Sequence, residues 1–117
     1  MLTLHLDPAQ FEKPTDDEKN DVFTGHERFQ AETRASGEFV ETKAFAEPAE
    51  TVTVRVRDGV AETSDGLYGE GPVWLCGYYV VGCETKERAI ELAAQIPDAA
   101  HTGVEVRPVV HEDATAS

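Results

Sequence analysis

The chain has few cysteines, and their spacing excludes the common sites that are built from thiols. Cys76 and Cys83 are the only two among 117 residues. They form neither the C-x-x-C pair of redox proteins nor the doubled pairs of a zinc site. We expect Cys76 to be a small buried side chain within a strand, and Cys83 to lie in the turn after that strand.

Long apolar runs and basic residues are also scarce. No segment approaches the roughly 20 apolar residues that span a bilayer, and the N-terminal segment is neither basic nor long and apolar. Ten Lys and Arg stand against 23 Asp and Glu, so the net charge is −13. Such a charge opposes nucleic-acid phosphates and anionic membrane surfaces. We therefore expect a cytoplasmic protein that binds neither nucleic acid nor membrane.

Several catalytic motifs are missing as well. The sequence contains no Walker loop, no G-x-G-x-x-G turn after a strand and no G-x-S-x-G elbow. Nucleotide binding and serine hydrolysis therefore have no support. No two of the four histidines have the i, i+4 spacing of a helical metal site. We expect no structural metal and no organic cofactor.

The size and composition of the chain are those of one small globular domain. Domains most often contain roughly 100–150 residues, and the hydrophobic fraction of 40% and charged fraction of 28% are close to globular averages. We expect a single domain over residues 1–110 and a flexible acidic tail over residues 111–117. A core of this size would gain from a partner subunit, so a homodimer is plausible.

Hydrophobic periodicity in the first third predicts a strand followed by a helix. Leucines alternate with polar residues over 2–6, which is the period of a half-buried strand. Thr15 and Glu18 have the spacing of a capping box, so the helix should begin near Thr15, and Gly37 is suited to ending it. His26 then shares the apolar stripe of this helix with Val22, Phe29 and Thr33.

The remaining two thirds predict strands, a hairpin and a second helix. Asp58-Gly59 is a strong signal for a tight hairpin turn, and Asp65 should lie in the loop after the hairpin. Pro97 should end the second helix, with His101 in the loop beyond it. The expected strands cover 39–45, 52–56, 60–63, 74–81 and 104–109, and the expected helix covers 84–96.

This order of elements predicts an α+β fold. It reads β-α-β-β-α-β with an extra hairpin strand, the ferredoxin-like pattern of an antiparallel sheet with both helices on one face. The other face of such a sheet would need a cover. A second copy of the chain could supply it, which would give a dimeric α/β barrel.

Three blocks of residues, together with a helix that carries Gly25-His26, resemble the YCII-related (DGPF-motif) family. The blocks are Ser64 to Glu70, Gly77-Tyr78-Tyr79 and Val104 to Pro108. The likeness extends over nearly the whole chain. Within the signature, Asp-Gly-Pro-Phe has become Asp65-Gly66-Leu67-Tyr68, and the charged pair expected after Glu70 is replaced by Pro72 and Val73.

The resemblance implies an active centre made of a histidine and an aspartate, which correspond here to His26 and Asp65. A histidine oriented by a carboxylate can move a proton near neutral pH. The implied reaction is an isomerisation or elimination on a small ring compound. His5, Tyr68 and Arg107 are candidate ligand-binding residues, and His5 should point away from the face occupied by the neighbouring leucines.

Each candidate also has a structural interpretation, and the sequence leaves the choice open. His26 could be a hydrogen-bonded core residue, and Asp65 could cap its own turn. Tyr68 could pack as an aromatic, and Arg107 could pair with a carboxylate. A non-catalytic small-molecule-binding or regulatory module associated with a sigma factor is accordingly the alternative function.

Overall fold

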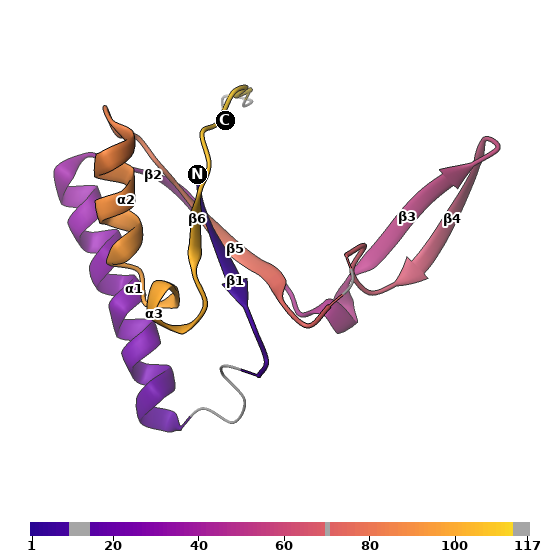
Figure 1. Cartoon of the computed structure of the whole chain (residues 1–117), viewed down its shortest axis with the longest axis horizontal. Coiled ribbons are helices and arrows are strands. Elements are labelled where there is room, and N and C mark those ends of the chain that lie inside the picture. Colours follow the sequence, from indigo (N-terminus) through magenta and orange to yellow (C-terminus); the bar gives the residue numbers. More distant parts are fainter. Residues whose placement is uncertain (10–14, 70, 114–117) are drawn as a thin grey trace.

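A four-stranded antiparallel sheet forms the body of the protein. In a computed structural model, which describes residues 1–9, 15–69 and 71–113, the strand order is β2-β5-β1-β6 (Figure 1). The chain is therefore an α+β protein, and this strand order is compatible with a ferredoxin-like fold. The strands are β1 (Leu2–Leu6), β2 (Phe39–Ala44), β5 (Trp74–Val81) and β6 (Val104–Val106).

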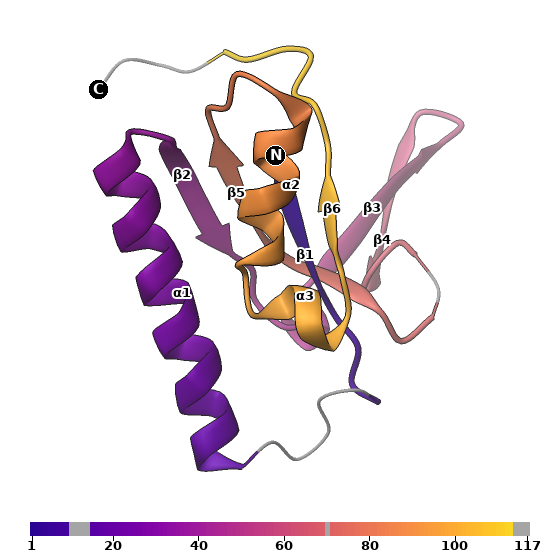
Figure 2. The ribbon, with the colours of Figure 1, turned by 60° about the vertical axis from the view of Figure 1, so that its left-hand side comes forward.

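The three α-helices formed by the described residues lie on one face of this sheet (Figures 1 and 2). They are α1 (Asp16–Ser36), α2 (Lys86–Ala94) and α3 (Asp98–His101). Helix α1 begins at the predicted capping box and ends at Gly37, which takes the left-handed conformation with φ of 80°. None of the described helices is long and apolar enough to cross a membrane.

The helices at the C-terminal end differ from the prediction. Helix α2 begins after Thr85, whose side chain accepts a hydrogen bond from the Arg88 backbone, and it ends at Ala94. Pro97 lies beyond the end of α2, as expected, but the chain then forms α3 where a loop was predicted. His101 is the last residue of that helix. Proline is well tolerated at the start of a helix, which explains the error.

The core lies between the sheet and the helices. Leu2, Leu4 and Tyr79 of the sheet meet Phe29, Leu92 and Ala93 of the helices, together with Ile96 of the segment between α2 and α3. Gly77 of β5 allows the edge strand β2 to approach closely, because a Cβ atom there would lie 2.7 Å from the carbonyl oxygen of Lys43.

The predicted hairpin is present but stands apart from the main sheet. Strands β3 (Val52–Arg57) and β4 (Val60–Asp65) form a separate two-stranded sheet after a short 3₁₀ turn (Pro48–Glu50). Figure 1 shows this hairpin, here called the arm (residues 52–65), projecting on the side opposite the helices. The sheet therefore gains no extra strand from it, and Asp65 is the last residue of β4 instead of a loop residue.

The arm makes the molecule extended for its length. The radius of gyration is 16.5 Å, whereas a compact chain of this length has about 13 Å. Of the expected tail, residues 114–117 lie outside the described residues, as does Glu70.

Candidate functional site

His26 lies at the centre of a hydrogen-bonded chain of three side chains. Its Nε2 atom is 2.8 Å from Oδ1 of Asp98, and its Nδ1 atom is 2.8 Å from the hydroxyl of Tyr79. These contacts join α1, α3 and β5. Both ring nitrogens of His26 therefore have partners within the protein.

A close approach of α1 and α3 brings His26 to Asp98. Gly25 precedes His26, and a Cβ atom added at Gly25 would collide with the side chain of Pro97, which precedes Asp98. Only glycine lets the two segments come this near. Gly25 thus allows α1 to pack closely against the segment before α3, and His26, the next residue, makes the hydrogen bond to Asp98.

The hydrogen-bond donors fix where the protons lie. The amide Nε2 of Gln30 donates to the Tyr79 hydroxyl oxygen at 3.2 Å. An ionised Asp98 carboxylate can only accept, so it accepts from Nε2 of His26, and the Tyr79 hydroxyl donates to the remaining Nδ1 atom. Neutral His26 then carries its proton on Nε2 and donates it to Asp98. Burial raises the pKa of Tyr79, whose exposed fraction is 2%, and keeps its hydroxyl protonated.

Asp98, and not His26, forms part of a cavity wall. A cavity of about 80 Å³, here called the inner cavity, is lined by Asp98, His5, His101, Val22, Leu6, Asp7 and Thr102. A wider outer hollow of about 460 Å³ shares His5, Asp7, His101 and Thr102 with it. His26 lines neither space. Of the three hydrogen-bonded side chains, Asp98 is thus the one that a ligand in the inner cavity would contact.

His5 forms part of the shared rim. Its Nε2 atom is 3.1 Å from the Thr3 hydroxyl and 3.3 Å from a carboxylate oxygen of Glu105. Its contact with Thr3, two residues earlier on β1, places the His5 side chain on the Thr3 face of the strand, opposite the buried Leu4.

The expected contact between His26 and Asp65 is not present within the chain. Asp65 pairs with Val52 at the end of the arm, whereas His26 contacts Asp98. Asp65 was chosen because it belongs to the Asp65-Gly66 motif. The carboxylate that contacts His26 in space is that of Asp98, which lies 72 residues away in the sequence. Only the three-dimensional packing of α3 on α1 reveals it.

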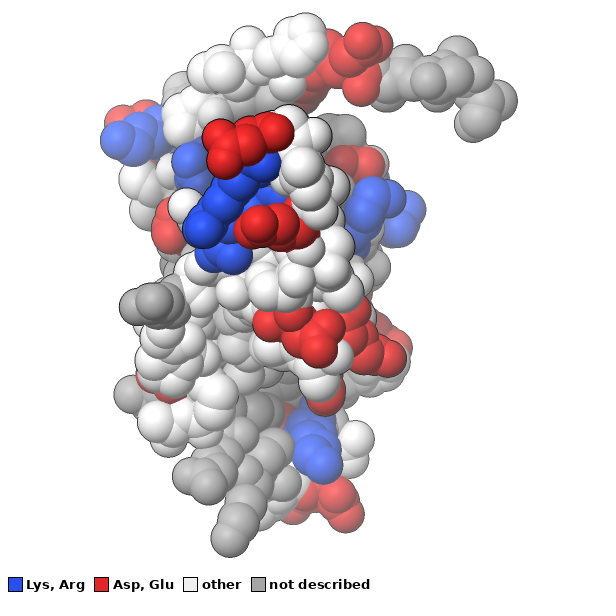
Figure 3. Space-filling model, turned by 90° about the vertical axis from the view of Figure 1, so that its right-hand side faces the viewer, with Lys and Arg blue, Asp and Glu red and all other residues white. Residues whose placement is uncertain are grey.

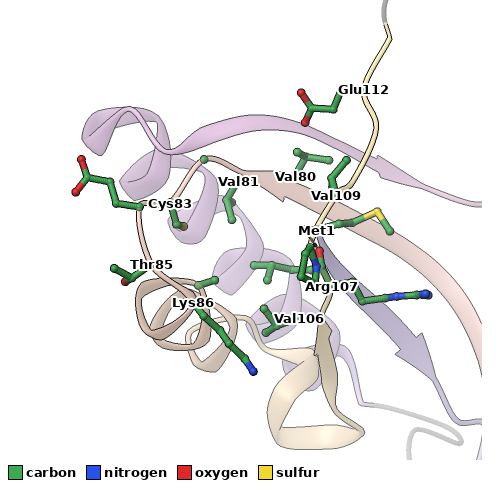
Figure 4. Close-up of a pocket in the computed structure, with 15 residues that line it drawn as sticks. Met1, Val80, Val81, Cys83, Thr85, Lys86, Val106, Arg107, Val109 and Glu112 are labelled. Atoms are coloured by element: carbon green, nitrogen blue, oxygen red, sulfur yellow. Dashed lines mark hydrogen bonds between the residues drawn. The ribbon is translucent and has the colours of Figure 1, made fainter.

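Tyr68 and Arg107 lie away from the histidine. Tyr68 is 76% exposed, and the Arg55 guanidinium lies 5.3 Å from its ring centre. Arg107 follows β6, where its backbone N–H donates to the Met1 carbonyl. It lines a separate hollow of about 460 Å³ at the other end of the sheet (Figure 4). The figure shows the Arg107 and Lys86 side chains diverging, so they do not form a cationic pair there.

Tyr79 and Asp98 of the hydrogen-bonded chain were not predicted from the sequence, and neither was Gln30, which donates to Tyr79. Gln30 lies four residues after His26, so the two share a helix face, and this spacing could have identified it. Asp98 follows a proline, the position of a helix start, and an α3 prediction would have drawn attention to it.

The two cysteines are unpaired and half-buried. Burial, followed by the negative charge of Asp98, raises the pKa of Cys76 to about 11. Burial and the neighbouring Glu38 likewise raise the pKa of Cys83. Neither thiol is poised as a nucleophile at neutral pH.

The described residues contain no group of three or more His, Cys, Asp or Glu that could hold a metal ion. The fold and site together define a small α+β protein with a carboxylate–histidine–tyrosine chain beside a cavity. No family model matches this chain, and no curated protein matches it either. The resemblance to the YCII-related family therefore stands on its motifs alone.

Proposed function

We propose that the chain is a YCII-related protein of ferredoxin-like fold that catalyses proton transfer on a small ring compound bearing a keto or hydroxyl group. One observation carries the proposal: the hydrogen-bonded chain from Tyr79 through His26 to Asp98 ends at the wall of a cavity. In this proposal Asp98 is the reacting carboxylate, whereas the sequence assigned proton transfer to His26 and the orienting role to Asp65.

The chemistry needs one free carboxylate oxygen and one fixed oxygen. Among the described residues, the carboxylate of Asp98 is hydrogen-bonded through Oδ1 alone, which leaves Oδ2 for a ligand. Oδ2 removes a proton from the carbon next to a carbonyl group, and the electron pair of that C–H bond moves into an enolate. Where the ring carries a β,γ carbon–carbon double bond, the enolate is conjugated with it, and the same carboxyl group returns the proton to the γ-carbon, so the double bond moves into conjugation without a cofactor.

His26 is a positioning residue in this scheme. Its Nε2–H holds Oδ1 in place, and Tyr79 fixes the tautomer from the opposite nitrogen. A carboxylate that is held by its neighbours loses less entropy when the substrate arrives.

The size of the two spaces limits how a ring compound binds. The inner cavity, about 80 Å³, is smaller than the roughly 150 Å³ that encloses a benzene ring. The ring would therefore occupy the outer hollow, with the reacting carbon directed into the inner cavity. His5 lies at the boundary between them and would contact the ring edge.

We also propose that two copies pair through the sheet face that carries no helix, as in a dimeric α/β barrel. The supporting observation is that all three helices cover the other face, and a sheet gains stability when both faces are covered. The outer hollow, which includes Glu105 and Val73, would then become more enclosed.

A second candidate function is a non-catalytic binding or regulatory module, such as a partner of a sigma factor. The observation that favours it is that both ring nitrogens of His26 are satisfied and Tyr79 is buried. A histidine in that state also serves simply to tie helices to the sheet. In this case the cavity would sense a ligand or have no role.

A thermal-shift screen of small phenols, quinones and keto acids tests the proposal. The proteins are the parent, Asp98→Asn, His26→Gln and the matched control Asp65→Asn. We expect a ligand that stabilises the parent and the control but not Asp98→Asn. Retained stabilisation in Asp98→Asn would exclude that carboxylate as the ligand contact, and failure of every ligand would favour the second candidate.

A further inference from the structure

Carboxylates line the space in which the ring compound would bind. Asp7 and Glu105 lie on the wall of the outer hollow, and Asp7 and Asp98 lie on the wall of the inner cavity. No Lys or Arg lines either space among the described residues. The described walls therefore present three carboxylates to a ligand and no permanently charged cation.

The two histidines on these walls cannot reverse the sign of this charge. His5 and His101 line both spaces, and Nε2 of His5 lies 3.3 Å from a carboxylate oxygen of Glu105. If both imidazole rings were protonated, two positive charges would stand against three carboxylates. The walls therefore keep a net negative charge wherever the three carboxylates are ionised.

Basic side chains do accompany carboxylates in other parts of the molecule. Viewed from the arm side, the surface shows basic side chains interleaved with acidic ones (Figure 3). On the arm, Glu62 lies 3.8 Å from Arg57. The hollow at the other end of the sheet is lined by Lys86 and Arg107 as well as by acidic residues. The acidic character of the proposed site is therefore a local property, beyond the net charge of the chain.

Asp7 and Glu105 are placed to distinguish between substituents on the ring. Asp98 supplies the reacting oxygen in the proposed scheme, whereas the other two carboxylates line the outer hollow, which would hold the ring. Charges near a protein surface interact through a lower effective dielectric constant than charges in bulk water. A carboxylate or phosphate group on the ring would therefore be repelled, and an ammonium group would be attracted.

We propose that the site selects ring ketones by charge, accepting neutral and ammonium-bearing compounds and rejecting those with a carboxylate or phosphate group. Asp7 and Glu105 are the residues that set this specificity. The selection rests on the proton transfer proposed above and narrows its substrate class. Asp98 loses its charge as it takes the proton, and the enolate gains one, so the total charge of the site does not change during the reaction. The selection therefore acts when the substrate binds.

Three ring ketones that differ in charge test the selection. They are cyclohexanone and its derivatives with a dimethylammonium or a carboxylate group on the ring carbon opposite the carbonyl. Exchange of the protons next to the carbonyl is followed in D₂O by ¹H NMR near neutral pH and at low salt, and the rate without protein is subtracted. We expect the anion to exchange at least about tenfold more slowly than cyclohexanone, and the cation at least as fast. High salt should reduce this difference, because it screens the charges.

Glu105→Gln and the matched control Glu62→Gln separate the charge of the site from the charge of the whole protein. Each variant removes one negative charge, and the two side chains are similarly exposed, 58% for Glu105 and 56% for Glu62. The ratio of the cation rate to the anion rate should fall by at least about threefold in Glu105→Gln and should not change in Glu62→Gln. Asp7→Asn should lower the ratio as well.

The possible failures of this experiment have different meanings. No exchange of any of the three ketones with the parent would overturn the proton transfer, and the selection with it. Exchange of all three at equal rates would overturn the selection and leave the proton transfer standing. An equal fall of the ratio in Glu105→Gln and Glu62→Gln would do the same, because the effect would then belong to the net charge of the protein.

Discussion

The Nε2 atom of His26 and the Oδ1 atom of Asp98 lie 2.8 Å apart, although 72 residues separate them in the sequence. This contact joins the long helix to the short one and ends at the inner cavity. It replaces the expected pair of His26 and Asp65. This contact requires a proton on Nε2 of His26, and it forms only because α3 packs closely on α1.

The first prediction concerns the tautomer of His26. Since an ionised Asp98 carboxylate can only accept from Nε2, the neutral ring should carry its proton there and accept from Tyr79 on Nδ1. Long-range ¹H–¹⁵N NMR spectra distinguish the two tautomers. A proton on Nδ1 would contradict the direction of the hydrogen-bonded chain. The Tyr79→Phe variant should keep the preference, because the Asp98 carboxylate still accepts from Nε2.

The second prediction concerns Gly25. In Gly25→Ala the new methyl group collides with Pro97, so α3 must move away from α1. We expect a loss of about 1–3 kcal/mol in the free energy of unfolding, as for other overpacked sites. Chemical denaturation measures it. Gly69→Ala is the control, because a Cβ atom there meets nothing; equal losses in both variants would show that helix contact is not the cause.

The third prediction concerns pH and the pair formed by Glu38 and Arg88. The guanidinium of Arg88 donates to both carboxylate oxygens of Glu38 at 2.9 Å, and these bonds lower the pKa of Glu38 to about 2. A lowered pKa stabilises the fold above the ordinary value of about 4.5, and that effect is lost as pH falls toward 2.

Glu38→Gln should therefore melt below the parent at pH 7, and the difference should shrink steadily between about pH 4.5 and pH 2. Thermal unfolding at a series of pH values measures this. A difference in Tm that stays constant across this range would mean that the charge of Glu38 does not stabilise the fold.

The fourth prediction concerns Cys76. A pKa of about 11 leaves about a hundredfold less thiolate at pH 8 than an ordinary cysteine has. Alkylation of Cys76 by iodoacetamide, followed by mass spectrometry, should be slower by about that factor than in the unfolded protein. Equal rates in folded and unfolded protein would show that the thiol is freely accessible.

The sequence was sufficient to predict the elements that local chemistry dictates. The capping box at Thr15, the glycine at position 37 and the alternation over β1 and β3 all depend on neighbours within a few residues. The hairpin turn at Asp58-Gly59 is of the same kind, since its two residues have φ of 51° and 78°.

The errors concern relationships between distant segments. Nothing near Asp65 or Asp98 in the sequence says which of them approaches His26, because the choice depends on how α3 packs on α1. Hydrophobic periodicity likewise cannot predict that the arm is separate from the main sheet, because a strand shows the same alternation of apolar and polar residues in either sheet.

Hydrogen exchange at carbon tests the central claim most directly. Small cyclic and open-chain ketones, dissolved in D₂O, are incubated with the parent, Asp98→Asn and Asp65→Asn, and loss of the signal from the proton next to the carbonyl is followed by ¹H NMR. We predict exchange with the parent and Asp65→Asn, and exchange slower by at least about a hundredfold with Asp98→Asn. Exchange that is absent from the parent, or unchanged in Asp98→Asn, would contradict proton transfer by Asp98.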